Sequence, residues 1–110
     1  MNKPEKINIL GHEYQIIYCD NPADVDLNKR ESKWGEVDYW TRKIRIYDNG
    51  RSIDGIWQTI IHEVLHVIGE SLKLECLDKG YDTDTRKHEE LDMIAMALTD
   101  ILFRNDFIKI

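Results

Sequence analysis

The sequence has 110 residues, enough to bury a core without disulfides, and it predicts a single domain spanning residues 1–110. Its formal net charge is −6 and its basic residues form no cluster, so we expect neither nucleic acid nor a membrane as a partner. The first residues are polar, no apolar run could cross a membrane, and Cys19 and Cys76 form no C-x-x-C motif, which predicts a cytoplasmic protein with two free thiols of undefined oligomeric state.

A β-hairpin is predicted at the start of the chain. Residues 7–10 and 13–18 are rich in Ile and Tyr and are separated by Gly11-His12, which indicates two strands and a tight turn. His12 is then expected to be a surface turn residue. The polar stretch over residues 20–33 follows, and Pro22 can start a short helical turn there.

A second hairpin is predicted from Trp34 onward, with its turn near Thr41-Arg42. Its inward side chains should be Val37, Tyr39, Ile44 and Ile46. The tryptophans of the chain are expected to be core or cleft-wall residues, and these are Trp34, Trp40 and Trp57.

Two helices are predicted after the hairpins. The first begins after Ser52 or Asp54, either of which can cap it, and continues to Leu72. Its apolar residues cover most of its circumference, so we expect it to be buried on most sides. The second begins near Thr85 and ends near Arg104. Its predicted core stripe has a 3.6-residue period and consists of Leu91, Ile94, Ala95, Leu98, Ile101 and Leu102.

The first helix contains the motif His62-Glu63-Val64-Leu65-His66. Residues four apart lie one above the other on a helix, so both imidazoles can point at one spot and supply two ligands of a tetrahedral zinc site. Glu63 points partly aside, where it can act as a general base on the attacking water without ligating the ion. The alternative is two core histidines bonded to backbone with a surface glutamate between them. The apolar helix favours the metal site, because buried imidazoles need polar partners.

A third metal ligand is expected at the start of the second helix, where His88, Glu89 and Glu90 follow one another. At about 100° per residue, His88 and Glu90 lie at opposite edges of the predicted core stripe, and Glu89 points away from it. His88 is preferred because Asp92 follows one turn later on the same side and could orient a liganding imidazole. Glu89 is the alternative, because predicted helix starts can shift by a residue.

The motif, followed about twenty residues later by a second helix, resembles the gluzincin-type minimal zinc peptidases. More narrowly, the chain is similar to the small metallopeptidase-like proteins of bacteriophages and prophages, which are related to the ImmA/IrrE and SprT-like zincins. The short strands at residues 7–18 and 34–47 fit this resemblance, as does the pattern of residues 98–102. The resemblance covers most of the chain, and H-E-x-x-H is its specific part.

The resemblance implies an α+β, minimal zincin-like fold: a small antiparallel-rich sheet packed on the active-site helix, with a second, C-terminal helix. It implies that His62 and His66 bind Zn²⁺ and that Glu63 is the catalytic acid/base. In such relatives the third ligand is a glutamate at the place that His88 occupies here, so either His88 replaces it or a one-residue shift brings in Glu89. Metzincins have a third histidine six residues after the second, where this chain has Leu72, so that family does not fit.

These observations predict a zinc-dependent metallopeptidase, phage or prophage encoded, that acts on a protein or peptide substrate. Glu63 would take the proton of the attacking water and pass it to the leaving amine. Tyr39, Tyr47 and Tyr81 could each be a second oxyanion donor. The alternative is a non-catalytic zinc-binding module that recognises a protein partner, although a structural site needs no base and usually has four protein ligands. A small α+β interaction domain without a metal is the third hypothesis.

Overall fold

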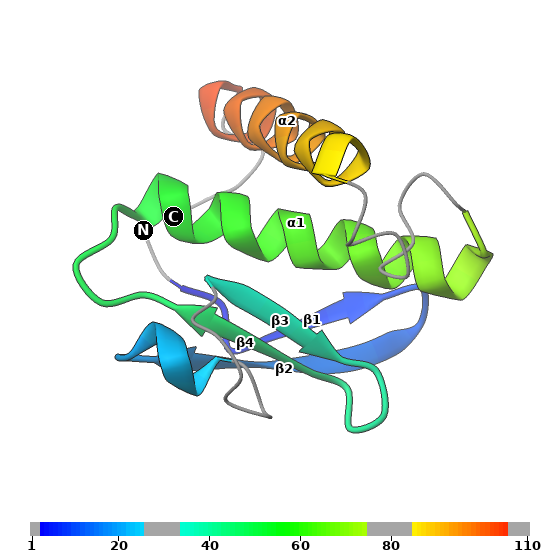
Figure 1. The fold of residues 1–110 in the computed structure, drawn as a ribbon, viewed down its shortest axis with the longest axis horizontal. Coiled ribbons are helices and arrows are strands. Elements are labelled where there is room, and N and C mark those ends of the chain that lie inside the picture. Colours follow the sequence, from blue (N-terminus) through cyan, green and yellow to red (C-terminus); the bar gives the residue numbers. More distant parts are fainter. Residues whose placement is uncertain (1–2, 26–33, 75–84, 106–110) are drawn as a thin grey trace.

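The computed structural model describes residues 3–25, 34–74 and 85–105, without the side chains of Pro22, Phe103 and residues 85–89. Within these ranges four strands and a short 3-10 helix precede two α-helices. The elements form three layers, in which helix α1 (Ile53–Leu72) covers one face of the sheet and helix α2 (Thr85–Arg104) crosses α1 on its far side (Figure 1). The chain is therefore α+β, as predicted.

Strands β1 (Lys6–Ile9) and β2 (His12–Cys19) form the first hairpin. Its two turn residues are Leu10 and Gly11, and both have a positive φ, 50° and 85°. A type I′ turn requires positive φ at both central residues, and glycine adopts it without steric cost. The predicted turn at Gly11-His12 is wrong by one residue, because His12 already belongs to β2 and pairs with Ile9 with its side chain exposed.

Strands β3 (Gly35–Asp38) and β4 (Lys43–Tyr47) form the second hairpin, which confirms the predicted turn region. The carboxylate of Asp38 closes the turn by accepting hydrogen bonds from the N–H of Trp40 at 3.0 Å and from the hydroxyl of Thr41 at 2.7 Å. The Thr41 hydrogen bond lowers the pKa of Asp38 from its usual value. Of the predicted inward side chains, Val37, Ile44 and Ile46 are buried and Tyr39 is half-buried.

The two hairpins join into one sheet with the order β1-β2-β4-β3. The junction is a parallel pairing of β2 with β4, in which Ile16 lies opposite Ile44, and the other two strand pairs are antiparallel. Parallel neighbours cannot be joined by a tight turn. The chain leaves β2 through the 3-10 helix η1 (Pro22–Asp24), where the side-chain oxygen of Asn21 accepts a hydrogen bond from the N–H of Ala23. The short helical turn is thus confirmed, whereas the parallel pairing was not predicted.

Helix α1 begins where the sequence predicts. Ser52 caps it, because the Ser52 hydroxyl accepts a hydrogen bond from the N–H of Gly55 at 3.1 Å. Lys73 ends it in the left-handed conformation and donates its N–H to the carbonyl of Gly69. The helix forms one core with the sheet. The buried members of that core are Ile9, Tyr14, Ile16, Val37, Ile44, Ile46, Ile56, Ile60 and Val67.

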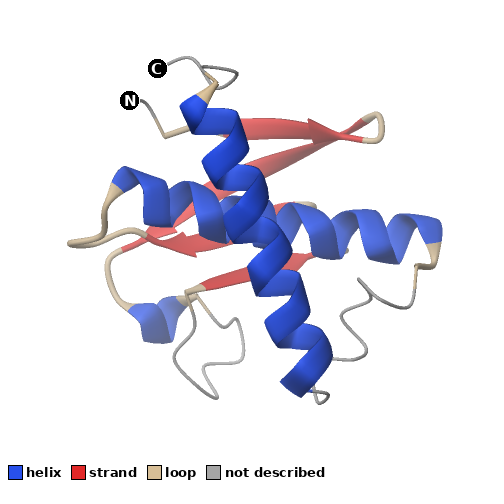
Figure 2. Cartoon of the chain, turned by 90° about the horizontal axis from the view of Figure 1, so that it is seen from above, coloured by secondary structure: helices blue, strands red, loops and turns tan. Residues whose placement is uncertain are grey.

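Helix α2 packs on α1 along a narrow line of side chains, Leu91, Ala95 and Thr99. The predicted core stripe is therefore wrong in part, because Ile94, Leu98 and Ile101 are exposed. Thr99 can take a buried place because its hydroxyl donates a hydrogen bond to the carbonyl of Ala95 at 2.7 Å. Seen from above, α2 crosses over the middle of α1 (Figure 2), and from the side α1 lies between α2 and the sheet (Figure 1).

Two tryptophans differ from the prediction. Trp34 and Trp40 are on the surface, with exposed fractions of 63% and 95%, whereas Trp57 packs partly against the core. Cys19 is free and buried, and burial raises the pKa of its thiol, while Cys76 lies outside the described residues. Among the described helices there is none that combines the length and the apolarity needed to cross a membrane.

Candidate metal centre

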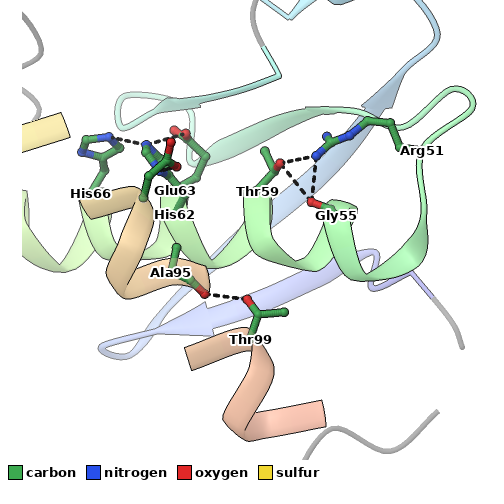
Figure 3. Close-up of polar contacts among 9 residues, drawn as sticks. Arg51, Gly55, Thr59, His62, Glu63, His66, Ala95 and Thr99 are labelled. Carbon is green, nitrogen blue, oxygen red and sulfur yellow. Dashed lines mark hydrogen bonds and ion pairs between the residues drawn. The ribbon is translucent and has the colours of Figure 1, made fainter. Parts of the chain in front are cut away.

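The two motif histidines converge on one point beside α1. They are four residues apart, and both are buried, with exposed fractions of 7% for His62 and 3% for His66. Their Nε2 atoms lie 3.1 Å apart, with the rings edge to face (Figure 3). Tetrahedral zinc bound at its usual ligand distances separates two nitrogen ligands by about 3.3 Å. The two imidazoles are therefore already spaced as a pair of zinc ligands.

Glu63 lies beside this point and not on the surface. Its exposed fraction is 4%, and its Oε2 atom is 3.9 Å from Nε2 of His62. The surface position that the alternative predicted for Glu63 is therefore wrong. Figure 3 shows the carboxylate next to the two rings, and among the described residues these three form the one group of side chains whose potential ligand atoms all lie within 4.8 Å.

Asp92 of helix α2 fixes the ring of His62. Its Oδ1 atom lies 2.8 Å from Nδ1 of His62. An ionised carboxylate can only accept hydrogen bonds, so Nδ1 of His62 carries a proton and donates a hydrogen bond to Asp92. In a neutral imidazole the Nε2 atom then has a lone pair, which is the form that ligates a metal. From the sequence we predicted that Asp92 orients the imidazole of His88, whereas in the structure it contacts the imidazole of His62. The crossing of the helices directs it to His62.

The two residues predicted as the third ligand, His88 and Glu89, have side chains outside the described part of the structure. Their backbone belongs to the first turn of α2. Glu90 is described, is exposed, and is not part of the group around His62. His88 and Glu89 therefore stay predictions.

Gly35 brings strand β3 against the centre of α1, and the sequence prediction missed this contact. A Cβ atom on Gly35 would lie 2.7 Å from Cγ2 of Thr59 and 3.1 Å from Cγ of Glu63. Real Cβ atoms do not approach that closely, so glycine is required for β3 to pass beside Glu63. A lone glycine in a predicted strand is the signal that could have indicated this close approach.

Arg51 also contacts Thr59, the residue of α1 that lies against Gly35. Its guanidinium donates hydrogen bonds to the carbonyl of Gly55 at 2.8 Å and to the hydroxyl of Thr59 at 2.7 Å, as Figure 3 shows. It also donates to the carbonyl of Tyr47 at 2.7 Å and lies 4.3 Å from the ring centroid of Trp34. Burial lowers the pKa of Arg51 from its usual value. Arg51 thus ties the end of β4 to the first turns of α1 and positions Thr59 against Gly35.

The remaining residues considered from the sequence lie elsewhere or are engaged. The hydroxyl of Tyr39 donates a hydrogen bond to the carbonyl of His66 at 3.3 Å, which anchors the β3–β4 turn to α1. Tyr47 lies at the end of β4, and Tyr81 lies outside the described residues. None of the three is thereby identified as an oxyanion donor.

Comparison of the chain with protein-family models, with curated proteins and with solved structures gives no match. The functional argument therefore rests on the chemistry of the site. Imidazole nitrogen and carboxylate oxygen are ligand types that zinc prefers. Two buried imidazoles with their Nε2 atoms 3.1 Å apart, one of them oriented by a carboxylate, fit a zinc ion, and without a metal the same spacing allows a hydrogen bond between the two rings.

Proposed function

We propose that this chain is a zinc-dependent metallopeptidase with a zincin-like arrangement, in which His62 and His66 bind the metal and Glu63 is the general base. One observation carries the proposal. Two buried imidazoles present their Nε2 atoms to one point, and a buried carboxylate lies 3.9 Å from one of them. A site with structural zinc alone has no use for that carboxylate as a base.

The residues of the site divide the chemistry between them. A bound zinc ion would supply Lewis-acid chemistry by acidifying water and polarising a carbonyl oxygen. Glu63 would accept a proton from the attacking water at Oε2 and return it to the leaving amine. Asp92 would keep the proton of His62 on Nδ1, so that Nε2 stays available to the metal. The burial of Glu63 keeps bulk water away and strengthens these charge interactions.

His88 is our proposed third protein ligand, with Glu89 as the alternative. Position 88 is four residues before Asp92 in α2, so both positions share one side of the helix. Asp92 reaches His62 from that side. A ligand one turn earlier would therefore approach the same group from α2. Three protein ligands would leave a position for water, as hydrolysis requires.

The sheet edge next to Glu63 supports a peptide substrate. Strand β3 is an edge strand. The carbonyl of Trp34 accepts a hydrogen bond from Tyr47, and because such pairs alternate, the N–H and C=O groups of Gly35 and Val37 point away from β4. No strand in the described ranges pairs with that side. An extended peptide added there would pass beside Glu63, which Gly35 touches.

The decisive experiment compares the wild-type protein with Glu63→Gln, with Glu70→Gln as the matched control. Glu70 lies on the same helix at a half-exposed position, where it pairs with Lys73. Each protein is loaded with zinc, analysed for metal, and incubated with a peptide library whose new termini are read by mass spectrometry. We expect one zinc per chain in all three and a loss of cleavage of about 10²- to 10⁴-fold in Glu63→Gln only.

The other outcomes separate the competing hypotheses. Equal cleavage by wild type and Glu63→Gln would reject Glu63 as the base. Stoichiometric zinc without cleavage by the wild type would reject the peptidase and favour a zinc-binding interaction module. A wild-type protein that binds no zinc would reject both and favour a metal-free interaction domain.

A further inference from the structure

The side of α2 that faces away from α1 carries both apolar and charged side chains, and no described element covers it. On this side lie Met93 and Ile101, with exposed fractions of 57% and 49%, together with the small Ala97, whereas Ile94 and Leu98 are exposed on one flank of the helix and Met96 on the other. Figures 1 and 2 show that no described element lies over this outer face of α2. Single exposed apolar residues are ordinary, so it is the arrangement of apolar and charged residues along this face that points to an interaction surface.

The outer face has a symmetric pattern centred on Ala97. Met93 and Ile101 lie four residues before and after it, and Glu90 and Arg104 lie seven residues before and after it. Steps of four and seven return to the same side of a helix, so these five residues form one stripe. Read outward from Ala97, each half of the stripe has an apolar residue and then a charge. The two charges have opposite signs.

We propose that the outer face of α2 binds the same face of a second copy of this chain, with the two helices antiparallel and a two-fold axis at Ala97. In that arrangement Met93 lies against Ile101 of the second copy. Glu90 lies against Arg104 of the second copy, and every contact occurs twice. The small side chain of Ala97 at the axis allows the helices to approach closely.

Charge complementarity selects a second copy over an unrelated partner. In an antiparallel pair of these helices, the apolar residues on either side of Ala97 face each other. The negative end of one stripe then faces the positive end of the other, so the stripe is self-complementary. In the parallel orientation Glu90 would face Glu90, and like charges in contact are unfavourable. Arg104 already pairs with Asp100 one turn away in its own helix through Nε. The guanidinium has further N–H donors on its two terminal nitrogens for a carboxylate across the axis.

The proposed interface leaves the metal centre untouched. Leu91, Ala95 and Thr99 face α1 from the opposite side of α2, and Asp92 is directed to His62. Dimer formation and the proposed peptidase activity are therefore separate properties. Either one can fail while the other holds.

The test is a charge swap measured by sedimentation velocity over a range of concentrations. The proteins are the wild-type full-length chain, Glu90→Arg, Arg104→Glu and the double variant. We expect a dimer in the wild type and a dissociation constant at least about tenfold higher in each single variant, because each places two like charges together twice. The double variant restores the pairs with the signs exchanged and should return to within about threefold of the wild type.

Two controls keep the result interpretable. Glu13→Arg makes the same change of charge on the exposed side of β2 and should leave the dissociation constant unchanged. Arg104→Glu also loses the contact with Asp100, so far-UV circular dichroism checks that each variant retains its helix content. Ala97→Glu places two carboxylates at the axis and should abolish the dimer without altering the fold.

Three outcomes would overturn the proposal. A wild-type protein that is monomeric at every concentration would leave the outer face to a different partner. Single charge reversals without effect would place any dimer interface elsewhere. A double variant as weak as the single ones would reject the antiparallel pairing of Glu90 with Arg104.

Discussion

Helices α1 and α2 have the same length, twenty residues, but opposite surroundings. Helix α1 is enclosed between the sheet and α2, and the motif side chains His62, Glu63 and His66 are buried with its apolar residues. Among the described side chains of α2, only Leu91, Ala95 and Thr99 are buried. In the enclosed helix α1 the unusual residues are the buried polar ones, which support our proposed metal site. In the more open helix α2 the unusual residues are the exposed apolar ones, which support our proposed interface.

The largest effect is expected when one isoleucine in each helix is replaced by alanine and the free energies of unfolding are compared. Ile60 in α1 is fully buried and Ile94 in α2 is 44% exposed. We expect Ile60→Ala to lower the free energy of unfolding by about 2–5 kcal/mol because it leaves a cavity. Ile94→Ala should change it by less than about 0.5 kcal/mol. Urea denaturation at a dilute concentration that keeps the chain monomeric measures both, and equal losses would contradict the difference in burial.

The sheet side of α1 can be probed at Gly35. Gly35→Ala brings a methyl group into the Cγ2 atom of Thr59 and should lower the free energy of unfolding by about 1–3 kcal/mol. Thr59→Ser removes that Cγ2 atom and keeps the hydroxyl that accepts from Arg51. The double variant should therefore lose less than the sum of the two single ones. Additive losses in this cycle would show that the methyl group is accommodated in another way.

The side of α1 that faces α2 can be probed at Asp92. Asp92→Ala leaves Nδ1 of His62 without its carboxylate and should weaken zinc affinity about 10- to 100-fold. Competition with a chromophoric chelator measures the affinity. Asp100→Ala removes a carboxylate from the same helix at a site that does not contact His62, so it is the control. Equal affinities in the two variants would exclude a role of Asp92 in metal binding.

The smallest effect is expected in the sheet, away from both helices. The hydroxyl of Tyr18 donates a hydrogen bond to the carbonyl of Pro4 at 2.6 Å, and burial raises the pKa of Tyr18 above its usual value of 10.0. The folded state therefore holds this proton more tightly than the unfolded state. That stability is present below pH 10 and is lost as the pH rises further. Tyr18→Phe should remove this alkaline loss in urea titrations at pH 8 and about pH 10.5, and unchanged curves would contradict the assignment.

Local patterns in the sequence predict much of α1 and the hairpins. The Ser52 cap, the end at Leu72 and the alternation that buries Ile44 and Ile46 depend on neighbouring residues, so they can be inferred without the tertiary structure. The parallel pairing of β2 with β4 depends on a long connection, for which short-range patterns contain no signal.

The contacts between the helices could not be predicted in the same way. Apolar residues occur on two sides of α2, so hydrophobic periodicity alone could not tell which side faces α1. The buried Thr99, whose hydroxyl bonds to Ala95, was omitted from the predicted stripe because it is polar. Asp92 was assigned to an imidazole in its own helix, and only the crossing of the helices brings it to His62. Within the site, the spacing of His62 and His66 was enough to predict their convergence.

The narrow contact of α2 has a kinetic consequence for the site. Among its described side chains, α2 buries a short line of residues against α1, and its Asp92 forms a hydrogen bond with His62. A segment with few buried contacts opens at a lower free energy than the whole chain unfolds, so its amide protons exchange with solvent sooner than those of α1. Each opening withdraws Asp92 from His62 while the core of α1 and the sheet stays folded. We therefore expect the lifetime of the contact between Asp92 and His62 to be set by the undocking of α2, and not by the stability of the whole fold.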